Sequence, residues 1–162
     1  MMGKTHLIIG IGSGLGAAVL LNLSVEQAAL LTVAAAAGSL LPDVDHPKGM
    51  IRQKLGILGL PLNILPHRGP THSLLAVVLL CTLAFFTYRL QPMFALTHPG
   101  LVIGYCSHLI ADMLTIEGIP LFYPLNNSYI SVLPIRTGGM IERVIALGVT
   151  IGAGYLAYLL VK

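Results

Sequence analysis

Residues 74–90 read LLAVVLLCTLAFFTYRL, and this run contains a single charged residue, Arg89. Four other stretches are similarly apolar, at residues 7–23, 25–41, 93–113 and 144–161. Each run is close to the roughly 20 residues that a membrane-spanning helix needs. The sequence therefore predicts an all-α fold, a polytopic helical membrane bundle with about five transmembrane helices.

The overall composition agrees with a surface that faces lipid. Of the 162 residues, 56% are hydrophobic and 9% are charged, whereas a water-soluble domain carries roughly a quarter charged residues. The length fits a single domain, residues 1–162. Lys and Arg number 9 against 6 Asp and Glu, but they are scattered between the apolar runs. We therefore expect the lipid bilayer as partner and no nucleic acid.

The distribution of basic residues predicts the orientation in the membrane. Five spans place the N-terminus and the loops 42–73 and 114–143 on one side, together with seven of the nine Lys and Arg residues. By the positive-inside rule this side is cytoplasmic, so the N-terminus is cytoplasmic and the C-terminus is outside. An alternative interpretation of the N-terminus is a cleaved signal peptide, in which Lys4 precedes an apolar run.

Small residues recur at a spacing of four. The repeated pairs are Gly10 and Gly14, Gly12 and Gly16, and Gly148 and Gly152. In lipid this spacing predicts helices whose backbones approach closely, because packing rather than hydrophobicity holds spans together. No strand precedes the N-terminal glycines, which argues against a nucleotide-binding loop. Ser24 is expected to cap the second run, with Glu26 in its first turn.

Most histidines and all aspartates fall at the cytoplasmic ends of the predicted spans. His6 precedes the first span, PDVDH at 42–46 follows the second, HRGPTHS at 67–73 leads into the third, and His108 and Asp112 close the fourth. The span count alone brings these four segments to one depth on one side. Ionisable residues near the membrane interior are costly, face the bundle interior and mark a functional site.

Two pairs within these segments leave alternatives open. His108 and Asp112 lie four apart on one helix face, where they chelate one ion or form a hydrogen bond that holds helices together. Asp43 and Asp45 lie between two prolines, so we expect an extended or turned segment. Its alternate residues point to opposite sides, which leaves only one of the two aspartates as a ligand.

The donor atoms available at this side are imidazole nitrogens and carboxylate oxygens, without a thiolate. This set suits a divalent metal ion, with Zn favoured and Mn, Fe or Mg as alternatives, and its size suffices for one or two ions. The candidate metal ligands are His6, Asp43, Asp45, His67, His72, His108 and Asp112. His98 begins the fourth span at its other end, so we expect it outside the site.

The stretch EGIPLFYP at 117–124 is apolar and aromatic, but two prolines interrupt it. It therefore cannot cross the bilayer as a helix. We expect it at the membrane interface as a wall or re-entrant lid over the cluster, with Tyr123 and Tyr129 at headgroup level. Arg136 and Arg143 follow, where an anionic headgroup or ordinary positive-inside anchoring accounts for them equally well.

These motifs resemble the YdjM-type proteins of bacterial and archaeal inner membranes, which are described as membrane-bound metal-dependent hydrolases. The resemblance rests on Thr5-His6, LPDVDH at 41–46, HRGPTHS at 67–73, SHL at 107–109 with Asp112, and residues 118–124. It covers nearly the whole chain, and HRGPTHS is its most specific motif. It implies a metal-dependent hydrolase of the inner (cytoplasmic) membrane. The implied ligands are His6, Asp43 or Asp45, His67, His72, His108 and Asp112.

The expected reaction is hydrolysis of an ester or phosphoester of a lipid-like, amphipathic substrate by water that the metal activates at the cytoplasmic face. Asp45 or Asp112 would act as general base, and Arg68 would stabilise developing negative charge. The alternative is a non-catalytic metal-binding membrane protein, either a metal transporter or a metal-stabilised scaffold. A transporter needs a polar site near the bilayer midplane, whereas these ligands gather at one end. The sequence leaves the oligomeric state open.

Overall fold

A computed structural model describes residues 1–46, 68–90 and 95–162. The described chain forms five α-helices, which are α1 Gly3–Leu20, α2 Val25–Gly38, α4 Leu74–Leu90, α5 Thr97–Met113 and α6 Met140–Val161. Two 3-10 helices, η1 Pro42–Asp45 and η3 Pro70–His72, precede and follow the long undescribed segment. Each α-helix coincides with one of the five apolar runs, so the all-α prediction is confirmed. The described residues contain no strand and only two isolated β-bridges.

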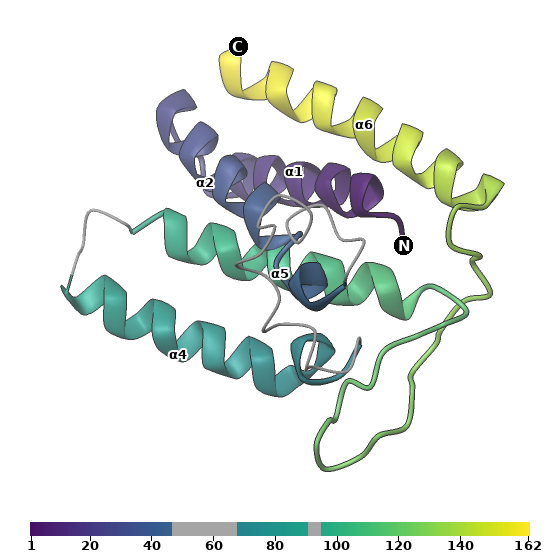
Figure 1. Cartoon of the computed structure of the whole chain (residues 1–162). Coiled ribbons are helices and arrows are strands. Elements are labelled where there is room, and N and C mark those ends of the chain that lie inside the picture. The colour runs from purple at the N-terminus through teal and green to yellow at the C-terminus, as the bar shows by residue number, and fades with distance from the viewer. Residues whose placement is uncertain (47–67, 91–94) are drawn as a thin grey trace.

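Helix length and composition support two of the five predicted membrane crossings. The helices α1 and α6 are long and apolar enough to span a bilayer, whereas α2 and α4 are apolar but shorter. The apolar window of α6 has none of its residues buried in the protein, and α4 has no buried residue. These two helices lie at opposite edges of the bundle, and many of their apolar side chains are exposed (Figure 1).

Close backbone contact holds the central helices together. The helix α1 packs against α2, α5 and α6, and α2 also packs against α5, while α4 packs mainly on α5 (Figure 1). A Cβ atom on Gly104 of α5 would collide with the carbonyl oxygen of Ala35, and one on Gly14 would lie 2.7 Å from Cα of Thr32. The absence of these two side chains lets the backbones touch, as the spacing of Gly10 and Gly14 predicts.

The equivalent prediction for α6 is wrong. A Cβ atom on Gly148 or Gly152 would have no described atom within 4 Å. The reason is the rotation of α6 about its axis, because it meets α1 through Val149, whose Cγ1 lies 2.9 Å from the Cβ position of Gly12. The two glycines of α6 therefore contribute no close helix contact in the described part of the chain.

Polar caps fix where two helices begin. Ser24 forms a capping box with Gln27: the Ser24 N–H donates to Gln27 Oε1 at 3.0 Å, and the Gln27 N–H donates to Ser24 Oγ at 3.4 Å. The predicted cap of the second run is thereby confirmed. Ser73 caps α4 in the same way, since its Oγ accepts from the N–H of Ala76 at 3.3 Å.

One end of the bundle collects the segments with polar residues. Figure 1 shows the N-terminus, the C-terminal end of α5, the N-terminal ends of α4 and α6, and the loop 114–139 at this end. The 3-10 helices η1 and η3 contact each other there, and η1 also contacts α5. We call this the loop end.

Candidate metal centre

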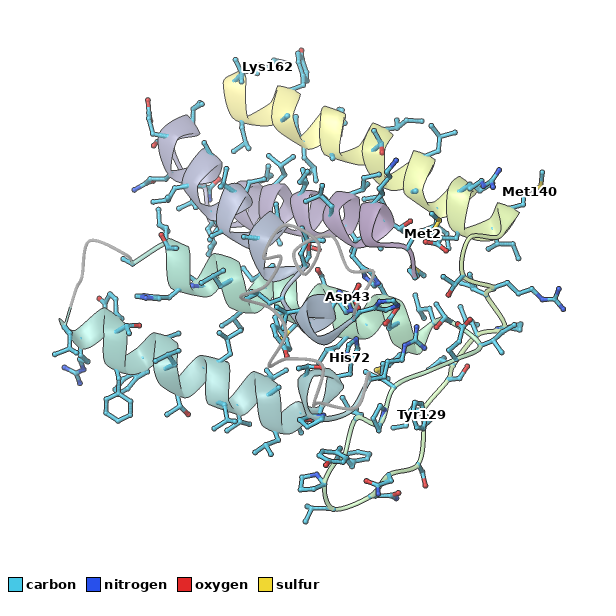
Figure 2. All side chains as sticks on the ribbon, viewed as in Figure 1. Met2, Asp43, His72, Tyr129, Met140 and Lys162 are labelled. Carbon is cyan, nitrogen blue, oxygen red and sulfur yellow. The ribbon has the colours of Figure 1, made fainter. Side chains whose placement is uncertain are left out.

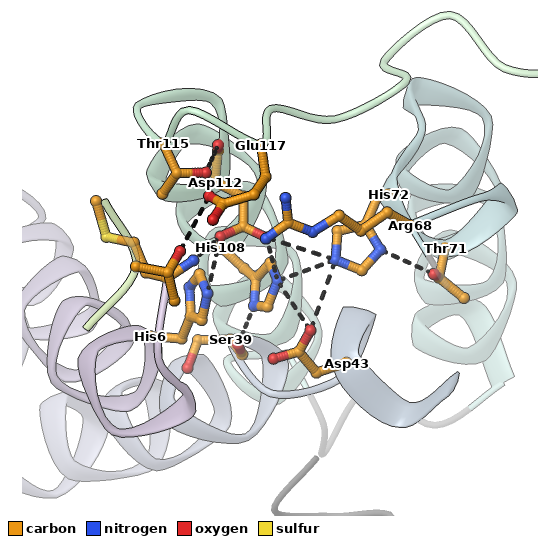
Figure 3. Close-up of polar contacts among 12 residues, drawn as sticks. His6, Ser39, Asp43, Arg68, Thr71, His72, His108, Asp112, Thr115 and Glu117 are labelled. Atoms are coloured by element: carbon orange, nitrogen blue, oxygen red, sulfur yellow. Dashed lines mark hydrogen bonds and ion pairs between the residues drawn. The ribbon is translucent and has the colours of Figure 1, made fainter. Parts of the chain in front are cut away.

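Five histidine and aspartate side chains from four segments meet inside the loop end (Figure 3). His6 comes from α1, Asp43 from η1, His72 from η3, and His108 and Asp112 from α5. The three histidines are fully buried and Asp112 is 1% exposed, while Asp43 is half-buried. Figure 2 shows Asp43 and His72 on neighbouring segments at this end, far from Lys162. The predicted convergence of these remote segments is present in the fold.

Two imidazole nitrogens and a carboxylate oxygen lie at separations close to those of metal ligands. The Nε2 atoms of His72 and His108 lie 3.3 Å apart. Asp43 Oδ1 lies 3.6 Å from the first of these nitrogens and 3.7 Å from the second. Asp112 Oδ2 lies 3.7 and 3.6 Å from them, respectively. Ligand atoms at about 2.0–2.2 Å from a tetrahedral zinc ion lie about 3.3–3.6 Å from one another. The two imidazoles therefore come close to this spacing with either carboxylate.

Hydrogen bonds on the far side of two imidazoles orient them for this role. The Nδ1 atom of His108 lies 2.7 Å from the carbonyl oxygen of Ser39. A carbonyl only accepts, so Nδ1 carries the hydrogen and Nε2 of the neutral ring keeps its lone pair toward the cluster. His72 Nδ1 lies 3.0 Å from Thr71 Oγ1. Metal-binding histidines typically have such an outer partner.

His6 lies against the cluster and contacts one of its carboxylates. Its ring stacks on that of His108, with centroids 3.6 Å apart, and its Nε2 lies 3.1 Å from Asp112 Oδ1. The side chain is fully buried. The placement of His6 therefore fixes the orientation of the Asp112 carboxylate. The same Asp112 oxygen also accepts from the Met1 amine.

Two candidate ligands, His72 and Asp43, lie outside the α-helices, and the shifts of their pKa values favour metal binding near neutral pH. Burial lowers the pKa of His72, which keeps its imidazole neutral. Burial acts to raise the pKa of Asp43, but the hydrogen bond with His72 and the nearby His108 and His6 outweigh it and hold this pKa well below its usual range. A neutral imidazole and an ionised carboxylate are the forms that bind a metal ion.

Arg68 connects the cluster to the loop 114–139. Its Nη1 donates to the carbonyl oxygen of Gly118 at 3.0 Å, and its Nη2 lies 3.6 Å from Asp112 Oδ2. Figure 3 shows Glu117 close to Arg68 on the same loop. Glu117 itself accepts a hydrogen bond from Thr137 at 3.1 Å. The segment 117–124 thus lies beside the cluster, and the charged contact at its start was missed by reasoning from the sequence.

The remaining predictions have mixed outcomes. His67 lies outside the described residues, and of Asp45 only the backbone is described, as the last residue of η1. Of the two expected conformations, extended or turned, residues 42–45 adopt the turned one, as a single 3-10 helix. Pro42 starts this turn, where its fixed φ suits a helix and its missing N–H is not needed. His98 lies outside the cluster as expected, at the first turn of α5, with Nε2 2.8 Å from Thr87 Oγ1.

Thr71 and Ser39 are further residues that the sequence alone did not single out. Thr71 has a signal in hindsight, because it directly precedes a ligand in the motif HRGPTHS. Ser39 acts through its backbone carbonyl, which every residue possesses, so no sequence signal marks it. Each of them contacts the Nδ1 atom of an imidazole ring, on the side that faces away from the cluster.

Comparison with known proteins places the chain among bacterial membrane proteins. A family model described as "YdjM inner membrane protein" matches residues 1–162. The "Uncharacterized protein YvsG" of Bacillus subtilis (strain 168) is 34% identical over 161 residues, which cover 99% of this chain and 96% of that protein. The "Inner membrane protein YdjM" of Escherichia coli (strain K12) is 38% identical over 126 residues, 74% of this chain. That alignment covers 62% of the Escherichia coli protein, less than two thirds of its length. No solved structure matches.

Proposed function

Because this chain belongs to the YdjM inner membrane protein family, we propose that its cluster binds one divalent cation and hydrolyses an ester or phosphoester of an amphipathic membrane substrate. The observation that carries this proposal is a pair of buried imidazoles 3.3 Å apart, with one carboxylate oxygen of Asp43 and one of Asp112 each 3.6 to 3.7 Å from both. These side chains come from segments that are remote in sequence, and binding of one cation would explain why the fold brings them together.

The geometry favours a single ion. His72 and His108 would contribute their Nε2 atoms, and Asp43 and Asp112 one oxygen each. The Nδ1 of His108 is already committed to Ser39, so this ring has one nitrogen for a metal, and one nitrogen does not bridge two ions. His6 would hold the second oxygen of Asp112. Zinc suits this mixed set best, with Mn, Fe and Mg as alternatives.

A divalent ion in this position supplies Lewis acidity, which polarises a carbonyl or phosphoryl group and lowers the pKa of water. Two members of the site are partly exposed, the side chain of Asp43 at 17% and that of Arg68 at 14%, so a substrate would approach from their side. The guanidinium of Arg68, held by Gly118, would stabilise negative charge that develops on the substrate. Asp112 is enclosed by histidines, which favours a ligand role and leaves Asp45 as candidate base.

We further propose that all five helices cross the bilayer, with the loop end in the cytoplasm and the C-terminus outside. Support comes from the exposed apolar side chains of α4 and α6, such as Leu79, Leu147 and Ile151, which are at least 60% exposed. The basic residues Lys4, Arg68, Arg136 and Arg143 belong to the loop end or its neighbourhood, as the positive-inside rule requires. The site then lies at headgroup depth on the cytoplasmic face.

A second function has one observation in its favour. Asp112 and the three histidines are buried almost completely, and an enclosed ion without an open coordination position is typical of a structural metal site. The alternative is therefore a metal-stabilised scaffold without catalysis. A transporter is less well supported, because the ligands lie at one end of the helices rather than midway.

The test is hydrolysis by the purified protein. The wild-type protein is reconstituted with an extract of bacterial lipids and Zn or Mn, and products are identified by mass spectrometry. We expect turnover that His72→Ala and Asp112→Ala abolish and that His98→Ala preserves, with all variants checked for folding by circular dichroism. Unchanged turnover in both cluster variants would reject the hydrolase assignment. Bound metal without turnover of any lipid class would favour the scaffold.

A further inference from the structure

A groove next to the cluster is lined by apolar side chains from two segments. Leu74, Leu75 and Val78 of α4 form one wall, and residues 121–125 form the other. The volume is about 430 Å³, within the range of small-molecule sites. Among the described residues that line it, Tyr123 alone has a polar side-chain group. Such a lining suits a hydrocarbon chain.

The groove begins beside the metal ligands. Leu74 follows His72 by two residues, so their Cα atoms are at most about 7 Å apart. The N–H of Leu74 donates to the carbonyl oxygen of Leu121 at 2.8 Å, which joins the two walls at this point. The loop that carries the second wall is also tied to Arg68, through Gly118. The joined end of the groove therefore lies close to His72 and is connected to Arg68 through the loop.

The other end of the groove opens onto surface that faces lipid in the proposed topology. Val78 lies one helical turn after Leu74, further along α4 and away from the cluster. Val78 is 52% exposed and Leu125 is 95% exposed. Apolar side chains with this exposure are in contact with bilayer hydrocarbon if α4 spans the membrane.

We propose that this groove binds one acyl chain of a lipid and so places the polar linkage of that lipid at the metal cluster. The inference rests on the proposed hydrolase function and narrows its substrates to lipids with a flexible acyl chain. Arg68 indicates the headgroup end: its guanidinium donates to Gly118 on the loop of the second wall and lies 3.6 Å from Asp112 Oδ2, so a phosphate that contacts Arg68 would lie beside the cluster. The apolar part of an amphipathic lipid would then lie in the groove, and its phosphate would lie near Arg68.

A second cavity provides an internal control. It has a volume of about 470 Å³ and is lined by residues of α4 and α5 that include Cys81, Tyr88 and His98. It is also mainly apolar, although His98 lines it, and it lies near the first turn of α5, whereas the candidate ligands of α5 are ten or more residues further along. Ten helical residues correspond to about 15 Å. A lipid held only by unspecific apolar contact would occupy both cavities.

The experiment is photo-crosslinking in bilayers. The full chain is reconstituted with a phosphatidylglycerol that carries a diazirine in one acyl chain, a metal chelator is added, and labelled residues are mapped by mass spectrometry. We expect labels enriched at residues 74–78 and 121–125 over α6 and over the second cavity. Val78→Trp should reduce this labelling to the level of α6, and Leu79→Trp, a neighbour outside the groove, should leave it unchanged.

The outcomes separate this inference from the proposed function. Uniform labelling of all lipid-facing helices, or equal labelling of the groove and the second cavity, would overturn the proposal that the groove binds an acyl chain. This holds whether or not the protein hydrolyses lipids. Enrichment in the groove without turnover in the hydrolysis assay would support the groove and reject the hydrolase. Because the chelator removes metal, a defect in metal binding does not affect the labelling.

Discussion

Replacing Thr71 by valine tests whether the imidazoles are held as metal ligands. Valine has nearly the shape of threonine, so Thr71→Val removes the hydroxyl and little else. The hydroxyl oxygen lies 3.0 Å from His72 Nδ1, on the side of the ring that faces away from the cluster. The backbone carbonyl of Thr71, which accepts from the Tyr105 hydroxyl, is unaffected. The substitution therefore changes the support of one ligand and keeps every ligand in place.

The expected loss follows from this single hydrogen bond. Losing a hydrogen bond to a fully buried group costs about 1–3 kcal/mol, and about 1.4 kcal/mol corresponds to a tenfold change in affinity. We expect zinc to bind about 10- to 100-fold more weakly, the range found for outer partners of metal-binding histidines. His72→Ala, which removes the ligand itself, should weaken binding further.

Zinc affinity is measured by competition with a chromophoric chelator on the detergent-purified protein. Thr150→Val is the matched control, because its hydroxyl makes a comparable bond to the carbonyl of Ala146 at 2.8 Å on the exposed face of α6. This control should bind zinc like the wild type. If Thr71→Val and the wild type bind zinc with equal affinity, within a factor of about two, the assignment of His72 Nε2 as a metal ligand that Thr71 orients through Nδ1 is refuted.

Three further predictions concern packing, capping and pH. Gly104→Ala should lower the melting temperature strongly, because its Cβ would collide with the carbonyl of Ala35. Gly152→Ala is the control, and it should be neutral or slightly stabilising because no described atom lies within 4 Å of its Cβ position. Equal melting temperatures of the two variants would contradict the close packing at Gly104. Ser24→Ala removes the capping box of α2 and should cost about 1 kcal/mol in unfolding free energy, measured by denaturant titration; no loss would show that this cap contributes nothing. The imidazole of His72 in the metal-free protein should gain its proton only below about pH 6.5, the ordinary histidine pKa, because burial lowers its pKa; an NMR titration measures this, and a midpoint above pH 7 would contradict it.

Most of the helical architecture could be predicted from the sequence. Apolar runs of 17 or more residues specify helices directly, and the structure has one α-helix in each. The meeting of His6, Asp43, His72 and His108 was also predictable, because consecutive antiparallel helices return every second connection to the same end. This prediction depends on the topology alone and requires no knowledge of side-chain contacts.

Finer features depend on tertiary geometry and were not accessible. The choice between tight and loose packing at Gly14 and Gly148 depends on the rotation of each helix, which glycine spacing does not specify. The 3-10 turn at Pro42 depends on how η1 meets η3 and α5. The hydrogen bond from His108 to the carbonyl of Ser39 uses a backbone atom, so the identity of residue 39 does not predict it.

The spread of the cluster along the chain has a consequence for biogenesis. Its members run from position 6 to position 112, so a nascent chain lacks the complete set until α5 has left the ribosome and reached its place in the bundle. A cation bound as proposed would therefore not nucleate folding of the first helices. It would bind late, and metal shortage in the cell would leave the five side chains assembled without their ion.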